Sequence, residues 1–314
     1  MSWKNYDPVE KMPFLYEESV PRSGVVIPTT DEVAWQHFKH FRWVYNKLEI
    51  AETQGLPCGL IPVPPTEYPV VVKPLHNLFG GGLGARVVHT QEQYALITDP
   101  GLFWSPYHFG DHHSIDLILQ EGEIREMFTF RGEKLQFGAF DYWELIQDDD
   151  DLLELIEPWV DEYMEGYTGC LNIETVGDYI IEVQLRMGDI DRLGDSQLLS
   201  AIHKLYNTGE WEYRRNTETP ETFFIAALFG QSGKDFDIDI NLFDYIVGME
   251  LVYYQFDDID TYHANPSHGN RVGIFCDDSW KNVAWARNIA IAMTKPEIEG
   301  FYVQPLKDYV ELSV

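Results

Sequence analysis

Two pairs of short apolar runs, each joined by a turn signal, constrain the fold of this chain more than any other feature. The first pair, HSIDLIL and EIREMFTF, lies within 113–130 and is separated by Gln-Glu-Gly. The second, CLNIETV and YIIEVQLR, lies within 170–186 and is separated by Gly-Asp. Short glycine-containing connections between apolar runs are typical of antiparallel hairpins. Helical patterns occur between the hairpins without regular strand–helix–strand periodicity, so the sequence predicts an α+β fold.

The remaining segments alternate between helical and extended patterns. Apolar residues spaced by threes and fours after a Thr-Thr-Asp cap predict one helix from Thr30 to Ala51, which Gly55 and Pro57 end. Similar patterns predict further helices at 90–97, 150–165, 196–211 and 279–293. Runs of β-branched and aromatic residues predict further strands at 68–74, 86–89, 223–229, 248–256, 270–276 and 301–306.

The charge of the chain restricts its partners. It has 52 acidic and 22 basic residues, a net charge of −30, and such a surface repels the phosphate backbone of DNA or RNA. No run approaches the roughly 20 apolar residues of a membrane span, and the amino terminus shows no signal-peptide pattern. We therefore expect a cytoplasmic protein without nucleic-acid or membrane partners. The acidity is interpreted as a surface adaptation to solubility or high salt.

The first segment that indicates chemistry is YPVVVKPLHNLFGGGLGARVV (68–88). A strand brings Lys73, a loop with four glycines follows, and a second strand returns. Glycines let backbone N–H groups approach phosphate oxygens closely, and the lysine adds a point charge. The segment lacks GK[ST], so it is not a Walker loop, and no helix follows the glycines, so it is not a dinucleotide fingerprint. It predicts a phosphate-covering hairpin, with an ordinary flexible hairpin tip as the alternative.

The second segment is the hairpin at 170–186, which carries acids on otherwise apolar strands. Strand alternation puts Glu182, Gln184 and Arg186 on one face. Oxygen ligands of this kind suit magnesium, and they are costly to bury without a cation or hydrogen-bond partner. The two-residue turn that the sequence favours would place Glu174 on the opposite face from Glu182, whereas a longer loop or a bulge would place the two acids together. An edge strand with its charged face in water is the alternative.

A cluster of residue types that bind transition metals lies at 108–116 and consists of His108, Asp111, His112, His113 and Asp116. His112 and His113 are neighbours on a predicted strand, so their side chains point to opposite faces. The two histidines cannot readily bind one metal ion together, and the cluster does not favour such a site.

Taken in order, these motifs resemble the ATP-grasp superfamily. WVYNKLEIAETQGLPCG…YPVVVKP is similar to the opening "DK…a…gip…yPvvvKP" of that family, and IIEVQLRMGD to its "viEvNpR" signature. FWSPYHFGDHHSIDLIL resembles the segment where the two lobes join and adenine binds. The likeness covers roughly residues 40–190, with a weaker one at 271–293. It implies an α+β ATP-grasp fold of two lobes clasping a nucleotide, with a shortened N-terminal segment at 1–56, a small lobe at 57–135 and a large lobe at 136–314.

The resemblance also implies roles for individual residues. Lys73 and Lys47 match lysines of the nucleotide site, and Lys73 and Arg186 would act in catalysis, with Arg186 steadying the acyl-phosphate and tetrahedral intermediates. The implied metal ligands are Glu174, Glu182 and Gln184, where Gln184 replaces the usual Asn. The other implied nucleotide contacts lie in the glycine-rich loop and where the lobes join, and they are Gly80, Gly81, Gly82, Gly84, Ser105, Tyr107 and His113.

The resemblance further implies an ATP-dependent carboxylate–amine ligase with ATP and Mg²⁺, or Mn²⁺, as cofactors. A small-molecule or peptide acid would become an acyl phosphate, which an amine or similar nucleophile would attack. The sequence identifies neither substrate and leaves the oligomeric state open. Two alternatives remain: a small-molecule kinase on the same fold, and a non-catalytic binding or structural protein. The replaced amide and the strong acidity favour the latter modestly.

Overall fold

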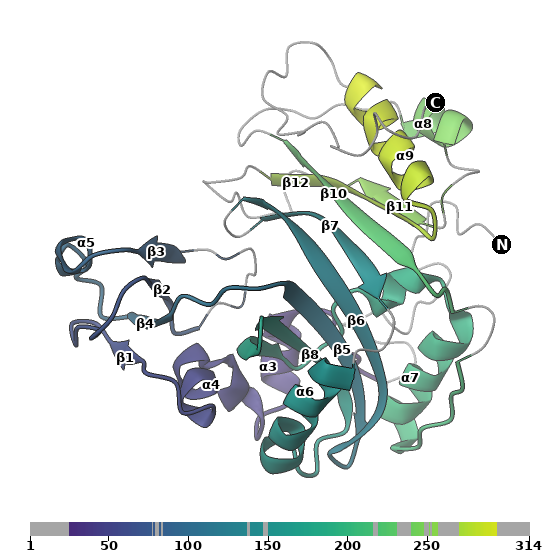
Figure 1. The fold of residues 1–314 in the computed structure, drawn as a ribbon. Coiled ribbons are helices and arrows are strands. Elements are labelled where there is room, and N and C mark those ends of the chain that lie inside the picture. Colours follow the sequence, from purple (N-terminus) through teal and green to yellow (C-terminus); the bar gives the residue numbers. More distant parts are fainter. Residues whose placement is uncertain are drawn as a thin grey trace. The chain divides into compact units, whose positions relative to one another are not determined.

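The structure, a computed structural model, describes residues 25–76, 78, 82, 84–136, 139–146, 150–215, 219–230, 240–247, 251, 253–256 and 270–293. These residues form two compact units (Figure 1). The larger unit holds the described residues up to Gly132 and those in Leu145–Glu221. The smaller unit holds the described residues in Glu133–Glu144 and from Thr222 on. Each unit draws on two chain segments, and the predicted division at residues 56 and 135 stays a prediction.

A small antiparallel sheet lies in the larger unit. Its strands are ordered β1-β4-β2-β3, and their bounds are Gly59–Leu60 (β1), Val70–Pro74 (β2), Arg86–Val88 (β3) and Leu102–Pro106 (β4). Val70 of β2 pairs with Val88 of β3, which confirms the predicted strands on either side of the glycine-rich loop. Helix α5 (Gln91–Ala95) follows, with Thr90 as its cap.

Four longer antiparallel strands of the larger unit are ordered β6-β5-β8-β9. Their bounds are His112–Gln120 (β5), Glu123–Gln136 (β6), Gly169–Val176 (β8) and Tyr179–Gln184 (β9). Both predicted hairpins are therefore confirmed. The β5–β6 turn is made by Glu121 and Gly122, with φ of 55° and 87°, the left-handed conformation that a tight two-residue hairpin requires.

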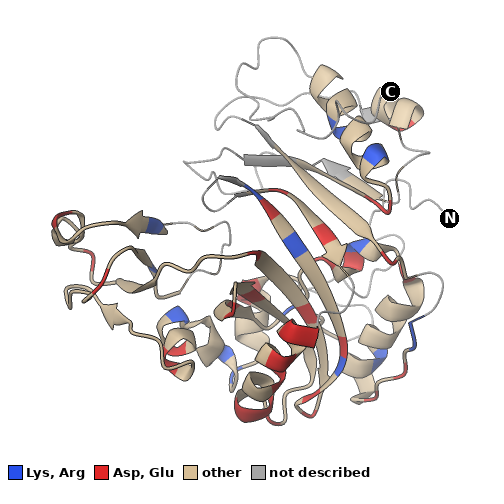
Figure 2. Ribbon diagram, viewed as in Figure 1, with Lys and Arg blue, Asp and Glu red and all other residues tan. Residues whose placement is uncertain are grey.

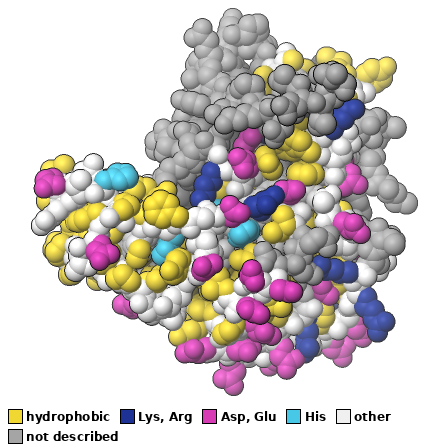
Figure 3. Space-filling model, in the orientation of Figure 1, with side chains coloured by type: hydrophobic (Ala, Val, Ile, Leu, Met, Phe, Trp, Pro, Cys, Tyr) yellow, Lys and Arg dark blue, Asp and Glu magenta, His cyan; other side chains and the backbone are white. Residues whose placement is uncertain are grey.

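Helix α6 (Asp150–Tyr163) covers the apolar face of β5 and β8 (Figure 1). Ile156 and Val160 of the helix belong to the same buried cluster as Leu117 and Ile173 of the strands. In Figure 2 the ribbon of this helix is red at its acidic residues, and Figure 3 shows acidic side chains gathered on the surface of this part of the molecule. The exposed acids are Asp150, Asp151, Glu154, Glu157, Asp161 and Glu162. The acidic run is thus the solvated side of an amphipathic helix.

The predicted single helix from Thr30 to Ala51 is wrong. The segment forms α3 (Asp31–His37), the 3₁₀ helix η1 (Arg42–Tyr45) and α4 (Lys47–Thr53). Asn46 explains the second break, because its side-chain oxygen accepts from the N–H of Leu48 at 3.2 Å and caps a new helix. Thr30 caps α3 as predicted. Two later elements complete the unit, the 3₁₀ helix η2 (Ile190–Leu193) and α7 (Ser196–Thr208).

The described residues of the smaller unit form four strands and two helices. The strands are ordered β11-β12-β10-β7, and their bounds are Ala139–Ile146 (β7), Phe223–Gly230 (β10), Tyr253–Phe256 (β11) and Asn270–Asp277 (β12). The helices are α8 (Ile240–Val247) and α9 (Trp280–Met293). Neither β7 nor α8 was predicted, β11 lies within the strand predicted at 248–256, part of which is not described, and the strand predicted at 301–306 lies outside the described residues. Among the described helices, none is long and apolar enough to cross a membrane.

Candidate active site

One face of strands β5, β8 and β9 is lined with polar side chains. The strand register pairs Ser114 with Glu174 and Asp116 with Asn172, and it pairs Glu174 in turn with Glu182. Directly paired residues of an antiparallel sheet point to the same side. The set on this face is His112, Ser114, Asp116, Asn172, Glu174, Glu182 and Gln184. The opposite face is the apolar one under α6, so the sheet separates a core from an oxygen-rich surface.

The two acids share this face because β9 contains a bulge. The turn is the two-residue Gly177-Asp178 that the sequence favours, and Thr175 pairs with Ile180. The next pair is Glu174 with Glu182, which leaves Ile181 as an extra residue without a partner in the ladder. An extra residue reverses the alternation that follows it. The predicted short turn and the predicted juxtaposition of the acids are therefore both present.

Two lysines from other elements lie on this hairpin. Lys47, the first residue of α4, places its Nζ 2.6 Å from Oε2 of Glu182. Lys73, on β2, donates from its Nζ to the carbonyl oxygen of Ile181 at 3.1 Å. Burial and then the charge of Lys47 lower the pKa of Lys73 to about 8, although Glu182 and Glu174 oppose the shift. The structure thus brings both predicted lysines to the predicted acids.

The acids have further partners within the protein. Oε2 of Glu174 lies 3.0 Å from Nε2 of His112. Burial alone would raise the pKa of Glu174, but the hydrogen bond with His112 and the nearby positive charges outweigh it, and the pKa is lowered. The side-chain amide of Gln184 donates to Oε1 of Glu182 at 3.2 Å. The acids of the polar face are therefore hydrogen-bonded to neighbouring side chains of the protein.

The donor set on this face fits a magnesium ion. Glu174 and Glu182 offer two cross-strand carboxylates and Gln184 an amide oxygen, and Mg²⁺ commonly takes only one or two carboxylates while keeping water and phosphate oxygens. The described side chains alone do not form a complete metal site. Within the described ranges, no group of three or more His, Cys, Asp or Glu side chains could hold a metal ion.

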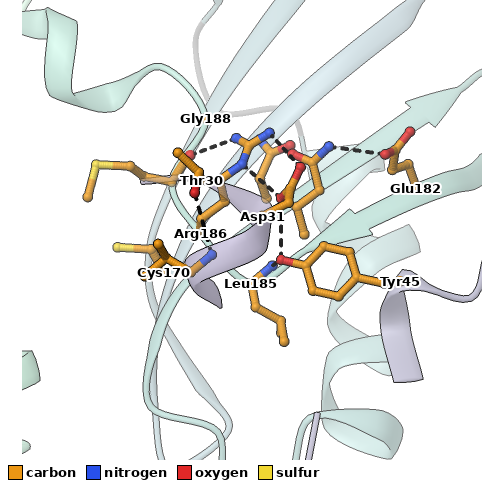
Figure 4. A network of polar contacts seen from close by, with 12 residues as sticks. Thr30, Asp31, Tyr45, Cys170, Glu182, Leu185, Arg186 and Gly188 are labelled. Carbon is orange, nitrogen blue, oxygen red and sulfur yellow. Dashed lines mark hydrogen bonds and ion pairs between the residues drawn. The ribbon is translucent and has the colours of Figure 1, made fainter. Parts of the chain in front are cut away.

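Arg186 is fixed by an acid that the sequence did not indicate (Figure 4). Its Nε donates to Oδ1 of Asp31 at 2.9 Å and its Nη2 to Oδ2 at 3.4 Å. Tyr45 donates its hydroxyl to the same carboxylate at 3.3 Å and accepts from the N–H of Leu185 at 3.2 Å. Asp31 is only 4% exposed. The start of α3 therefore holds the guanidinium at the end of the acidic hairpin.

Asp116, which the sequence indicated only as a member of the histidine and aspartate cluster, holds the loop that follows Arg186. Its buried carboxylate accepts from the N–H groups of Gly188, Asp189 and Ile190 at 2.5, 2.9 and 3.2 Å. Burial raises its pKa to about 6, against the effect of these donors. A Cβ at position 188 would lie 2.8 Å from the side-chain nitrogen of Asn172. Only glycine lets the backbone approach this closely.

The predicted nucleotide contacts are less tightly grouped. Ser105 is buried on β4 opposite Val71. The N–H of Tyr107 donates to the carbonyl oxygen of Pro69 at 3.2 Å. His113 lies opposite Thr175, on the other face of the sheet from Glu174. The structure therefore does not bring His113 together with the acids.

The glycine-rich loop is described only in part. Gly82 and Gly84 have φ of 62° and 77°, the left-handed region that favours glycine. Gly80 and Gly81 lie outside the described residues, so their predicted contact with phosphates stays a prediction.

Comparison with known proteins shows likeness in fold but not in sequence. No family model and no curated protein matches the chain. Among solved structures, L-amino acid ligase from Bacillus licheniformis is similar, with a TM-score of 0.56, 13% identity, and coverage of 84% of this chain and 83% of that one. Carboxyaminoimidazole ribonucleotide synthase from Aspergillus clavatus, complexed with ATP, has a TM-score of 0.58 at 12% identity, covering 82% and 75%.

A third similar structure is the biotin carboxylase domain of the Hydrogenobacter thermophilus 2-oxoglutarate carboxylase, solved with MgADP, ADP and bicarbonate. Its TM-score is 0.56 at 11% identity, covering 85% of this chain and 68% of that one. Likeness at such low identity establishes the fold. The chain has the ATP-grasp fold, as its motifs predicted.

Proposed function

We propose that this chain, with its ATP-grasp fold, is an ATP- and magnesium-dependent ligase that activates a carboxylate for attack by an amine or similar nucleophile. The observation that carries the proposal is the contact of two lysines with the acidic hairpin. Nζ of Lys47 lies 2.6 Å from Glu182, and Lys73 donates to Ile181 in the bulge. The similar structures support it, because they include a ligase and structures solved with ATP and with MgADP.

The polar face would hold the nucleotide and its metal. Lys47, Lys73 and the glycine-rich loop would bind the phosphates, while Glu174 and Glu182, with the oxygen of Gln184, would bind Mg²⁺. Bound magnesium would supply positive charge to the phosphate oxygens. The lysines are suited to this role because each lies on the acidic hairpin, Lys47 against Glu182 and Lys73 against Ile181.

In the proposed reaction, a carboxylate oxygen of the substrate attacks the γ-phosphorus and ADP leaves with the electrons of the broken P–O bond. The nucleophile, an amine, then adds to the acyl carbon, loses a proton and expels phosphate. Arg186 would hold the acyl oxygen as it becomes tetrahedral. Its bonds to Asp31 and to the carbonyl of Met187 use three of its five N–H groups, which leaves two for the substrate.

Binding and product analysis test the proposal in turn. A ligand present at 100 times its dissociation constant stabilises a protein by about 2.7 kcal/mol, so Mg-ATP should raise the melting temperature of the wild type. Glu182→Gln should reduce this shift, and the exposed control Glu154→Gln should not. A ligase releases inorganic phosphate together with a coupled product, whereas a kinase leaves a stable phosphoester.

A non-catalytic protein is the second candidate, and one observation favours it. Glu182 is already satisfied by Lys47 and Gln184, and Glu174 by His112, so the polar face needs no ligand to be stable. The absence of a thermal shift with Mg-ATP, together with identical behaviour of Glu182→Gln, would establish this candidate and refute the ligase.

A further inference from the structure

The bulge in β9 determines where Glu182 points. A hairpin with the same two-residue turn and no bulge would continue from the pair of Thr175 and Ile180 to a pair of Glu174 and Ile181. Glu182 would then face the apolar side of the sheet together with Ile173. A shift of one residue turns every following side chain to the other face. The acid pair of the proposed metal site therefore depends on one extra residue.

The turn sequence alone does not determine that a bulge forms, because the same Gly-Asp turn also suits a regular hairpin. Strand β9 is the last in the order β6-β5-β8-β9, so none of the strands that the structure describes pairs with its outer edge. Backbone groups on such an edge need other partners. At the bulge, these partners are side chains from outside the sheet.

The side chain of Gln54 supplies the first of these partners. Its Oε1 accepts from the N–H of Ile180 at 2.8 Å, and its Nε2 donates to the carbonyl oxygen of the same residue at 2.8 Å. A single amide thus makes both bonds that a neighbouring strand would make. Nε2 also donates to the carbonyl of Ile50 at 2.8 Å, which fixes the amide to the end of α4.

Helix α4 is bonded to β9 at both of its ends. At its start, Lys47 pairs with Glu182, and just after its end Gln54 pairs with Ile180. Between these points, Lys73 binds the carbonyl of the extra residue, Ile181. The three side chains bind residues immediately before, within and immediately after the bulge.

We propose that Gln54 is a positioning residue that selects the bulged register of β9 and so places Glu182 beside Glu174. This deepens the proposed function and, in its link to metal binding, rests on it. Gln54 itself touches no reacting group; it acts through the backbone of Ile180. The expected consequence is that Gln54 controls the affinity for the metal more than the affinity for the nucleotide alone.

The test compares Gln54→Leu with Thr53→Val. Leucine keeps most of the volume and removes both bonds to Ile180, whereas Thr53 lies on the same helix and bonds Ile50 and Trp159 but not β9. Titration of Mg²⁺ into the ATP complex should show at least a tenfold weaker metal affinity for Gln54→Leu, about the effect of losing a group that orients a ligand. Metal-free ATP affinity should change less than about twofold, because Lys47 and Lys73 remain. Unchanged metal affinity in Gln54→Leu would overturn the proposal.

A direct measurement of register separates this proposal from the proposed function. In wild type, NMR should show cross-strand contacts between the backbones of Glu174 and Glu182, and Gln54→Leu should replace them with contacts between Glu174 and Ile181. Retention of the wild-type contacts would refute the role of Gln54 even if ATP binds. If the wild type binds no ATP but Gln54→Leu still shows the shifted register, the proposed ligase is refuted and the positioning role of Gln54 stands. If Gln54→Leu does not fold, the same NMR contacts are measured in Gln54→Glu, which keeps an acceptor for the N–H of Ile180, removes the donor to the carbonyl oxygens of Ile50 and Ile180, and adds a negative charge.

Discussion

The charge of Lys73 makes nucleotide binding pH-dependent at the scale of a single residue. Its pKa is lowered to about 8 in the free protein, and bound phosphate would favour the charged form and raise it again. The lysine is therefore mostly charged at pH 7, about half charged at pH 8, and neutral well above that value. We predict that the affinity for Mg-ATP is constant from pH 6.5 to 7.5 and falls progressively above about pH 8, as measured by calorimetric titration.

Lys73→Arg is the matched control for this prediction, because a guanidinium stays charged throughout this range. The variant should bind Mg-ATP more weakly at neutral pH, since arginine differs in shape, but its affinity should not change between pH 7 and 9. If the wild type and Lys73→Arg lose affinity in parallel above pH 8, another group is responsible.

Asp31 should matter for stability as much as for any reaction. It is buried and is the acidic partner of Arg186, so removing it leaves a guanidinium without its counter-charge. Breaking a buried pair in this way typically costs about 3–5 kcal/mol. We predict a loss in this range for Asp31→Ala in urea unfolding. Glu123→Ala, which breaks an exposed pair with Arg125, should cost less than about 1 kcal/mol, and equal losses would contradict the prediction.

At the scale of elements, the β8–β9 turn packs against the segment that leads into β5. Gly177 has a φ of 56°, and a Cβ there would lie 2.6 Å from the carbonyl oxygen of Phe109. Gly209, after α7, has a φ of 74° with open space around it. Both Gly→Ala changes carry the left-handed penalty of about 1–2 kcal/mol. We predict that Gly177→Ala lowers the free energy of unfolding in urea by clearly more than Gly209→Ala does. Similar losses would contradict this prediction and show that the turn can move to accommodate a Cβ.

The elements also show which parts of the fold could be predicted from the sequence. The hairpins were predictable because alternation and turn residues are local signals. The bulge was not, since what stabilises it includes Gln54, 126 positions from Ile180 along the chain. The division of the segment after Thr30 into α3, η1 and α4 was missed because the apolar spacing continues across the breaks.

The same distinction applies to the site. Lys73 and Glu182 were found through the residues around them, which form recognisable motifs. The roles of Asp31 and Asp116 were missed because their partners, Arg186 and the backbone of 188–190, come from distant parts of the chain. Asp31 has the local appearance of an ordinary acid in the first turn of a helix. Charged side chains that support a site from far along the chain leave no local pattern.

At the scale of the whole molecule, the dominant property is a net charge of −30. Like charges at this excess repel one another and destabilise the compact state, and salt screens the repulsion over a Debye length of about 10 Å at 0.1 M. Helix α6 shows the effect locally: Glu154, Glu157 and Asp161 are exposed at spacings of three and four residues (Figure 2). Like charges at such spacings destabilise a helix by about 0.2–0.5 kcal/mol per pair.

This repulsion predicts that the melting temperature rises when NaCl is increased from 20 to 500 mM. Glu157→Lys should raise the melting temperature at 20 mM, because it reduces the net charge and turns two repulsive spacings on α6 into attractive ones. Its gain over wild type should shrink as salt is added, since screening weakens both effects. Glu157→Gln removes the repulsion without adding attraction, so it should lie between the two. A melting temperature of the wild type that falls with NaCl would mean that attractive pairs such as Lys47–Glu182 outweigh the excess of negative charge.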